Sequence, residues 1–289
     1  MNRRGFTLIE LIVALVLMGI ISGAIYQLLV TNQRVYRNQT QRADLNANLR
    51  TVVSLLPTEL WELNAGDAIA SDILVMSADS IAYKAARSMY TLCSPPTVST
   101  PTSGTVVLGN RWYGVRPFDG KRDGVMLFAE GDRATRLDNV WVHAEPSGTA
   151  SAATCADGSA GITFSLKNIA PAGWLAAVDS GAPLRVYEVM KVKTYTDAYG
   201  DYWVGTQRLS LPLGWAGLEP VLGPIAASGL QFEYFDNTGL VTADPTQVAR
   251  IRITVIGRTH QAVSTAGGQN EHVVDTLVTQ VALRNNIRQ

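Results

Sequence analysis

The chain has 289 residues, 47% of them hydrophobic and 17% charged, a composition typical of a globular protein with one large domain or two small ones. Its 24 lysines and arginines balance its 24 aspartates and glutamates, so the net charge does not support nucleic-acid binding. Two cysteines, Cys93 and Cys155, are too few for a zinc site built from CxxC pairs or for a small disulfide-rich fold.

The first element is an apolar run over residues 6–30 that contains one charge, Glu10. As a helix it would be about 37 Å long, enough to cross a hydrocarbon core of about 30 Å. A cleavable secretory signal is the alternative, because residues 22–24 (Ser-Gly-Ala) supply a small-x-small site. The run continues to Val30 and holds a charge, and both features disfavour a signal peptide. The segment therefore predicts a single-pass membrane helix.

Glu10 is costly inside this helix. An acidic side chain at mid-bilayer costs about 2.5 to 3.5 kcal/mol on insertion scales, so we expect the carboxylate to have a partner. Cleavage between Gly5 and Phe6 would create a positive α-amino group one helical turn before Glu10. It would also place the carboxylate near a helix N-terminus, where the helix dipole favours negative charge. The alternative is a simple anchor in which the glutamate is accidental.

Residues 3–10, RRGFTLIE, resemble the prepilin motif of type IV pilins and type II secretion pseudopilins. The shared features are a short basic leader, Gly5 before the cut, Phe6 after it, and Glu10 four residues further on. The resemblance implies that a prepilin peptidase removes residues 1–5 at the cytoplasmic face and that Phe6 becomes N-methylated. It also implies that Glu10 pairs with the amino group of a neighbouring subunit during filament assembly.

The same resemblance implies a location and partners. The expected location is the inner membrane, with the head in the periplasm and later in a pilus or pseudopilus. The expected partners are the prepilin peptidase, other major and minor pilins or pseudopilins, and the inner-membrane assembly platform.

The helix is expected to continue through an amphipathic second half, residues 31–65, to a total length of about 90 Å. Pro57 should bend or restart it, and Gly66 is a plausible C-terminal cap near Ala65. Apolar residues at spacings of three and four form one stripe, which favours packing against a head over an isolated coiled coil. The stripe consists of Leu45, Leu49, Val52, Val53, Leu56 and Leu60.

Residues 66–289 predict an antiparallel β-rich head, so the expected fold class is α+β, with a long N-terminal helix packed on the head as in pilins. Tyr199–Asp201 and Asp236–Gly239 predict turns. Short runs rich in Val, Ile, Tyr and Phe predict strands. The runs are Ile73–Met76, Ser80–Ala85, Val125–Ala129, Asn139–His143, Leu184–Thr194, Tyr202–Leu209, Leu230–Phe235, Ala249–Ile256 and Val273–Leu283.

The C-terminal part carries a second resemblance. Leu230–Asp236, the arginine-bearing run Arg250–Ile256 and residues 281–285 resemble the C-terminal half of J-type minor pseudopilins and W-type minor pilins. The head, about 224 residues over positions 66–289, is long for the J-type and favours the W-type.

Two segments rich in small and polar residues, 94–103 and 148–161, predict surface loops. Cys93 borders the first and Cys155 lies inside the second. In an oxidising compartment we expect a Cys93–Cys155 disulfide to tie these loops together.

No residue pattern predicts a catalytic, metal or cofactor site. The three histidines, His143, His260 and His272, lack metal-ligand spacing. Asp119 with Asp123, and Asp197 with Asp201, lack the closing glutamate of an EF-hand, so turn capping is favoured over calcium binding.

The function expected is that of a minor filament subunit in a type IV pilus or a type II secretion pseudopilus, and not that of an enzyme. A tip adhesin, or a surface- or DNA-binding tip subunit, is the alternative. It would use the segments 94–110 and 144–161, or exposed aromatic side chains. The aromatic candidates are Trp112, Tyr113, Tyr199, Tyr202, Trp203 and Trp215.

Overall fold

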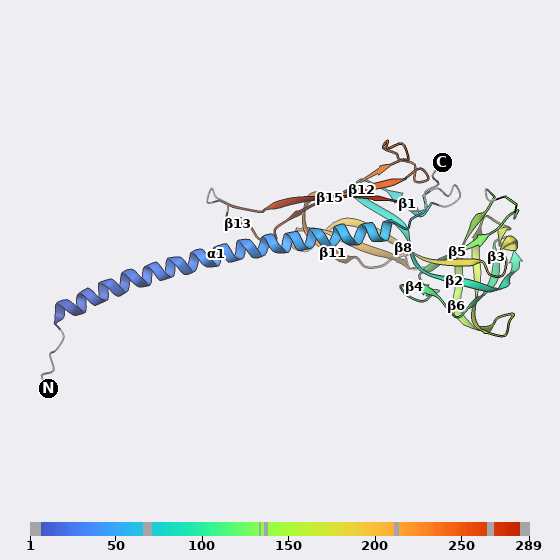
Figure 1. Cartoon of the computed structure of the whole chain (residues 1–289), viewed down its shortest axis with the longest axis horizontal. Coiled ribbons are helices and arrows are strands. Elements are labelled where there is room, and N and C mark those ends of the chain that lie inside the picture. The colour runs from blue at the N-terminus through green and yellow to red at the C-terminus, as the bar shows by residue number, and fades with distance from the viewer. Residues whose placement is uncertain are drawn as a thin grey trace, which may run out of the picture.

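A computed structural model describes residues 7–65, 71–132, 134–135, 138–210, 214–264 and 269–283. It confirms the α+β class, a long helix followed by an antiparallel β-rich head (Figure 1). The elements are α1 (Leu8–Leu60), β1 (Ile73–Met76), β2 (Ser80–Thr100), β3 (Ser103–Gly109), β4 (Tyr113–Gly114), β5 (Asp123–Ala129), β6 (Val140–Thr154), β7 (Ala160–Ala170), the 3₁₀ helix η1 (Trp174–Ala177), β8 (Pro183–Thr196), β9 (Tyr202–Ser210), β10 (Gly214–Trp215), β11 (Glu219–Phe235), β12 (Arg250–Arg258), β13 (Val263–Ser264), β14 (Asn270–Glu271) and β15 (Val274–Ala282).

Helix α1 has 53 residues, a length of about 80 Å. The expectation that it restarts at Pro57 and reaches Ala65 is wrong, because α1 runs unbroken through Pro57 and ends at Leu60. Pro57 lies in the last turn, where its missing N–H removes only one bond, and its own carbonyl still accepts from the Trp61 N–H at 2.9 Å. Gly66 lies outside the described residues.

The apolar stripe of α1 packs on the head, as its periodicity predicts. Leu45, Leu49, Val52, Leu56 and Leu60 are buried in one core with the sheet, whereas Val53 is half-buried. The helix approaches the sheet closely at Gly257, where an added Cβ would lie 2.6 Å from Leu45 Cδ1. The second half of α1 is therefore a core element of the head.

The sheet beside α1 has the strand order β1-β2-β8-β9-β11-β12-β15, and each of these pairings is antiparallel. We call it the helix-packed sheet. One face of it supplies apolar side chains to the core that α1 covers, among them Ile81, Val192, Ile225 and Ile253.

The long strands β2 and β8 continue past this sheet into a second module. Their distal halves and four further strands pair in the closed order β2-β3-β7-β6-β5-β8-β2. This circuit of described strands is a barrel with its own buried core, which includes Leu108, Leu127, Val142, Phe164 and Leu166. Figure 1 shows the barrel strands at the end of the molecule opposite the free N-terminal end of α1.

Each strand predicted from the sequence is present. Several of them are longer than predicted, and other strands of the structure were not predicted. The largest error concerns the segments 94–103 and 148–161, which were predicted to be loops but mostly belong to β2, β3, β6 and β7. Pro95 and Pro96 are accommodated because the β2–β3 pairing shifts register between Ser94 and Thr97, so no regular ladder bond is required of them.

Candidate assembly site on the N-terminal helix

Helix α1 begins with a capping box. Thr7 is the N-cap, and its backbone N–H donates to Glu10 Oε2 at 3.0 Å while its hydroxyl donates to the same oxygen at 2.9 Å. The Glu10 N–H donates to Thr7 Oγ1 at 3.3 Å. The spacing Thr-x-x-Glu allows this reciprocal arrangement, which satisfies backbone groups that a helix start otherwise leaves open. The structure therefore holds the Glu10 side chain at the helix start.

The capping box uses one carboxylate oxygen of Glu10. Within the part of the chain that the structure describes, the contacts of this carboxylate all go to Oε2, and Oε1 has none. The residue is exposed. A positively charged group from outside the described residues can therefore reach the carboxylate without breaking the cap.

The helix surface around and beyond Glu10 is apolar and uncovered. An 18-residue window of α1 has a mean hydropathy of 2.6 and none of it is buried in the molecule. Residues such as Leu8 and Ile9 are 81% and 70% exposed. A soluble core helix would be covered by its own head, so the exposed apolar surface of α1 fits membrane anchoring.

The first 26 residues match the family model described as a prokaryotic N-terminal methylation motif. The chain therefore carries a pilin-type N-terminal methylation motif. The pilin-type motif implies processing by a prepilin peptidase and assembly with filament components, and the apolar helix fits membrane anchoring. No curated protein and no solved structure matches the chain.

The structure places some of the sequence-predicted site residues of this pilin-like chain. Gly5 and Phe6, the expected cleavage and methylation positions, lie outside the described residues, whereas Glu10 is described. Cys93 and Cys155 form a disulfide with a Cα–Cα distance of 5.3 Å and lie far from the helix start. The disulfide ties β2 to the turn between β6 and β7, both within the barrel module.

The other candidates lie apart from one another. Among the described residues no group of three or more His, Cys, Asp or Glu is placed to hold a metal ion. His143 Nδ1 lies 3.3 Å from Lys84 Nζ, His260 lies 3.6 Å from an Asp201 oxygen, and His272 Nδ1 lies 2.7 Å from the Thr259 carbonyl oxygen.

The acidic pairs serve as turn and ion-pair groups. Asp197 Oδ1 accepts the N–H groups of Tyr199 and Asp201, and the Asp201 side chain pairs with Arg258. Asp123 is fully buried and pairs with Arg116. The carboxylates of Asp123, Asp197 and Asp201 are thus already engaged.

The aromatic candidates are spread over the head, and Trp203 among them is half-buried. Tyr113, 76% exposed, lines a groove of about 680 Å³ beside β2, together with Trp141 and Arg185. Trp215 lies on β10, where Lys191 Nζ is 5.8 Å from its ring. Trp203 donates from Nε1 to Asp197 Oδ2 at 2.9 Å. These positions belong to different elements.

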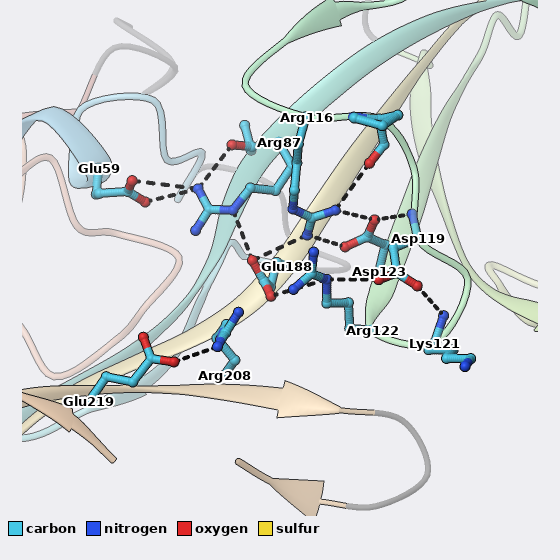
Figure 2. Close-up of polar contacts among 12 residues, drawn as sticks. Glu59, Arg87, Arg116, Asp119, Lys121, Arg122, Asp123, Glu188, Arg208 and Glu219 are labelled. Atoms are coloured by element: carbon cyan, nitrogen blue, oxygen red, sulfur yellow. Dashed lines mark hydrogen bonds and ion pairs between the residues drawn. The ribbon is translucent and has the colours of Figure 1, made fainter. Parts of the chain in front are cut away.

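Sequence reasoning missed a buried network of charges that joins three parts of the fold (Figure 2). Arg87 on β2 bonds Glu188 on β8 through Nε at 3.0 Å and contacts Glu59 of α1 at 3.2 Å. Arg116 donates to Asp123 Oδ2 at 2.8 Å and lies 3.2 Å from Glu188. The one available signal was a charged residue within a strand-like run, as at Arg87 and Glu188.

The network shifts the acidity of its central carboxyl group. Burial by itself would raise the pKa of Glu188, but hydrogen bonds from Arg87 and Arg116, with their positive charges, bring it below its usual value. Its side chain is only 4% exposed. Glu188 is therefore a buried carboxylate held in the charged form where α1, the helix-packed sheet and the barrel meet.

Proposed function

We propose that this protein is a minor pilin or pseudopilin subunit with a mechanical rather than an enzymatic role. The prepilin peptidase cleaves it between Gly5 and Phe6, and Phe6 is then N-methylated. The subunit sits in the inner membrane with its head in the periplasm. It then enters a filament through α1 on an assembly platform, where it contacts other subunits and helps to prime assembly. The match over residues 1–26 supports this proposal most strongly.

The uncovered apolar half of α1 and the accessible Glu10 carboxylate support the same mechanism. Lipid covers the helix before assembly, and helices of neighbouring subunits cover it afterwards. In the filament the Glu10 carboxylate pairs with the α-amino group of a neighbour, which compensates for the charge in apolar surroundings. The head length of about 224 residues favours the W-type minor pilin within this group.

The substitutions Glu10→Ala and Glu10→Gln test this role. Glutamine keeps an oxygen that can accept from Thr7 and so preserves the capping box, but it removes the charge. We expect both variants to insert into the membrane normally and to be incorporated about tenfold less into filaments, the loss of roughly 1.4 kcal/mol of pairing free energy. Membrane flotation and quantitative immunoblotting of sheared filaments measure the two steps.

The Glu10→Gln variant separates the effect of the charge from the effect of the capping box. If it enters filaments as well as the unmodified protein does, the charge of Glu10 has no assembly role. If Ala fails and Gln succeeds, the helix cap rather than the charge matters.

A tip adhesin, or a surface- or DNA-binding tip subunit, is the second candidate function. The observation that favours it is the barrel at the end of the molecule farthest from the N-terminus of α1 (Figure 1). Because most of the segments 94–103 and 148–161 are barrel strands, the test should change turns only, at residues 101–102 and 156–158. Loss of binding with filaments intact supports adhesion, and loss of filaments supports priming.

A further inference from the structure

Strand β15 forms one end of the helix-packed sheet. It pairs with β12 over nine consecutive residues without a register shift, and no other described strand pairs with it. The opposite end of the sheet, β1, has four residues and a register irregularity between Ile73 and Val75. Short or irregular edges resist further pairing, whereas long regular edges invite it. The two edges of this sheet are therefore unequal.

The outward-facing backbone groups of β15 can be assigned from its bonds. The Thr259 N–H donates to the Val273 carbonyl and the Leu283 N–H donates to the Ala249 carbonyl, so odd-numbered residues face β12. Successive residues of a strand direct their backbone groups to opposite sides. The even-numbered residues therefore direct an N–H and a C=O away from the sheet. They are Val274, Thr276, Val278, Gln280 and Ala282.

One of these donors is already bonded within the chain. The Thr276 N–H donates to Asp275 Oδ1 at 2.8 Å. This donor in the N-terminal part of β15 is therefore not available to an incoming strand. The segment from Val278 to Ala282 has no such internal cap among the described residues. An incoming strand would therefore pair with this segment.

The side chains of β15 do little to prevent such pairing. Its sequence, VDTLVTQVA, contains no proline, lysine or arginine, and Asp275 is its one charged residue. Proline, lysine and inward charges are the usual means by which edges are protected. Val274 and Val278 are each 53% exposed on the face away from α1, and Val278 lies opposite Thr254 of β12. The even-numbered side chains of β15 are thus uncharged, and on this face Arg252 and Arg250 of β12 lie opposite Gln280 and Ala282.

We propose that β15 accepts an extended strand from the head of a neighbouring filament subunit. The strand would bond the backbone of residues 278–282 and place apolar or β-branched side chains beside Val278, as cross-strand packing favours. The choice of a filament neighbour rests on the proposed function and on position. Strand β15 lies alongside α1 (Figure 1), and Leu277 and Val281 belong to the core that α1 shares with the sheet. A filament neighbour whose own helix runs beside α1 would bring its head next to this edge.

The test is Gln280→Pro in the full-length protein. The N–H of residue 280 points away from β12, so proline removes a donor of the free edge while the β12–β15 ladder is kept. We expect incorporation into filaments to fall about tenfold, because the association constant of the subunit for its neighbour falls by roughly one order of magnitude. Val278→Lys, which places a charge on the edge, should act in the same direction.

Thr276→Pro is the matched control, because it also introduces an edge proline but at a donor that Asp275 already occupies. It should enter filaments normally. Denaturant unfolding of each variant in detergent should show an unchanged midpoint. If Gln280→Pro unfolds at a lower denaturant concentration than the unmodified protein, incorporation of Val278→Lys alone tests the proposal.

Amide hydrogen exchange supplies a direct measurement on the unmodified protein. The amides of Val278, Gln280 and Ala282 should exchange fast in the detergent-solubilised subunit and at least about tenfold more slowly in the filament. Fast exchange in the filament, or normal incorporation of Gln280→Pro and Val278→Lys, overturns the proposal. Either result leaves the assembly role of Glu10 standing, because that role is tested by Glu10→Gln alone.

Discussion

Glu188 is the carboxylate shared by Arg87 and Arg116 in the buried charge network of the head. It lies on β8, the strand that passes from the helix-packed sheet into the barrel, and it accepts from Arg87 and Arg116. A buried ion pair adds little stability compared with apolar packing. Removing one partner, however, leaves the other charges without compensation in a low-dielectric interior, which is strongly destabilising. The geometry of the network is therefore sensitive to loss of this one carboxylate.

The substitution Glu188→Gln should lower the free energy of unfolding by about 3 kcal/mol, because Arg87 and Arg116 lose a charged acceptor in a buried place. Glu233→Gln is the control. Glu233 pairs with Arg252 on the surface with its side chain 48% exposed, and its loss should change the free energy by less than about 1 kcal/mol. Denaturant unfolding of the detergent-solubilised chain measures both. Equal losses for the two variants would contradict the role of burial.

The same residue predicts a pH dependence. The pKa of Glu188 is lower in the folded protein than its usual 4.5, so the folded state binds this proton less readily than the unfolded state. The stability that this carboxylate contributes is present above pH 4.5 and is lost as the pH falls through the lower, folded pKa. The unfolding free energy of Glu188→Gln should therefore decline less than that of the unmodified protein on acidification below pH 4.5.

At the scale of elements, α1 has two surfaces with different partners. The part before residue 37 is almost wholly exposed, whereas Leu45, Leu49, Val52, Leu56 and Leu60 are buried under the sheet. The periodicity of the second part predicted this packing, because spacings of three and four place side chains on one face of a helix. The local sequence thus suffices to assign both surfaces.

Adjacent leucines allow this assignment to be measured. Leu56 is 2% exposed and Leu55 is 44% exposed. Leu56→Ala should lower the free energy of unfolding by about 2 to 5 kcal/mol, since it opens a cavity between α1 and the sheet. Leu55→Ala, the same chemical change one residue away, should have an effect of about 0.5 kcal/mol or less. Comparable losses would mean that the helix is rotated relative to the sheet.

Strands β2 and β6 show where local reasoning about elements failed. The segment Ser94–Ser103 contains Pro95, Pro96 and Pro101 among serines and threonines, a composition typical of loops. Yet Thr97 pairs with Thr105 and Val98 with Gly104 across the β2–β3 hairpin. Register shifts within this hairpin, together with the pairing of β3 with the distant strand β7, overrode the composition.

At the scale of the whole molecule, the two hydrophobic cores are joined by shared strands. The first half of β2 and the second half of β8 cover the α1 core. The second half of β2 and the first half of β8 close the barrel. No flexible linker separates the modules at these strands, so local opening of one module should disturb the other.

We therefore expect the helix-packed sheet and the barrel to unfold in one cooperative transition. Hydrogen exchange in rising denaturant should show peptides from β6 and β7 losing protection at the same concentration as peptides from β11 and β12. Earlier loss of protection in the barrel peptides would show that the shared strands do not couple the modules. The Cys93–Cys155 disulfide should be kept oxidised in this experiment, because it constrains the barrel alone.

The sequence by itself determined the pilin-type N-terminal motif, an apolar helix long enough to span a membrane, the buried stripe of α1 and the existence of most strands. Each of these depends on residues that are close in the chain, so order, hydropathy and periodicity carry the information. The tertiary structure alone decided the closure of the barrel, the open edge of β15 and the charge network. Arg87 and Glu188 are 101 positions apart, and no local pattern indicates that two such strands become neighbours.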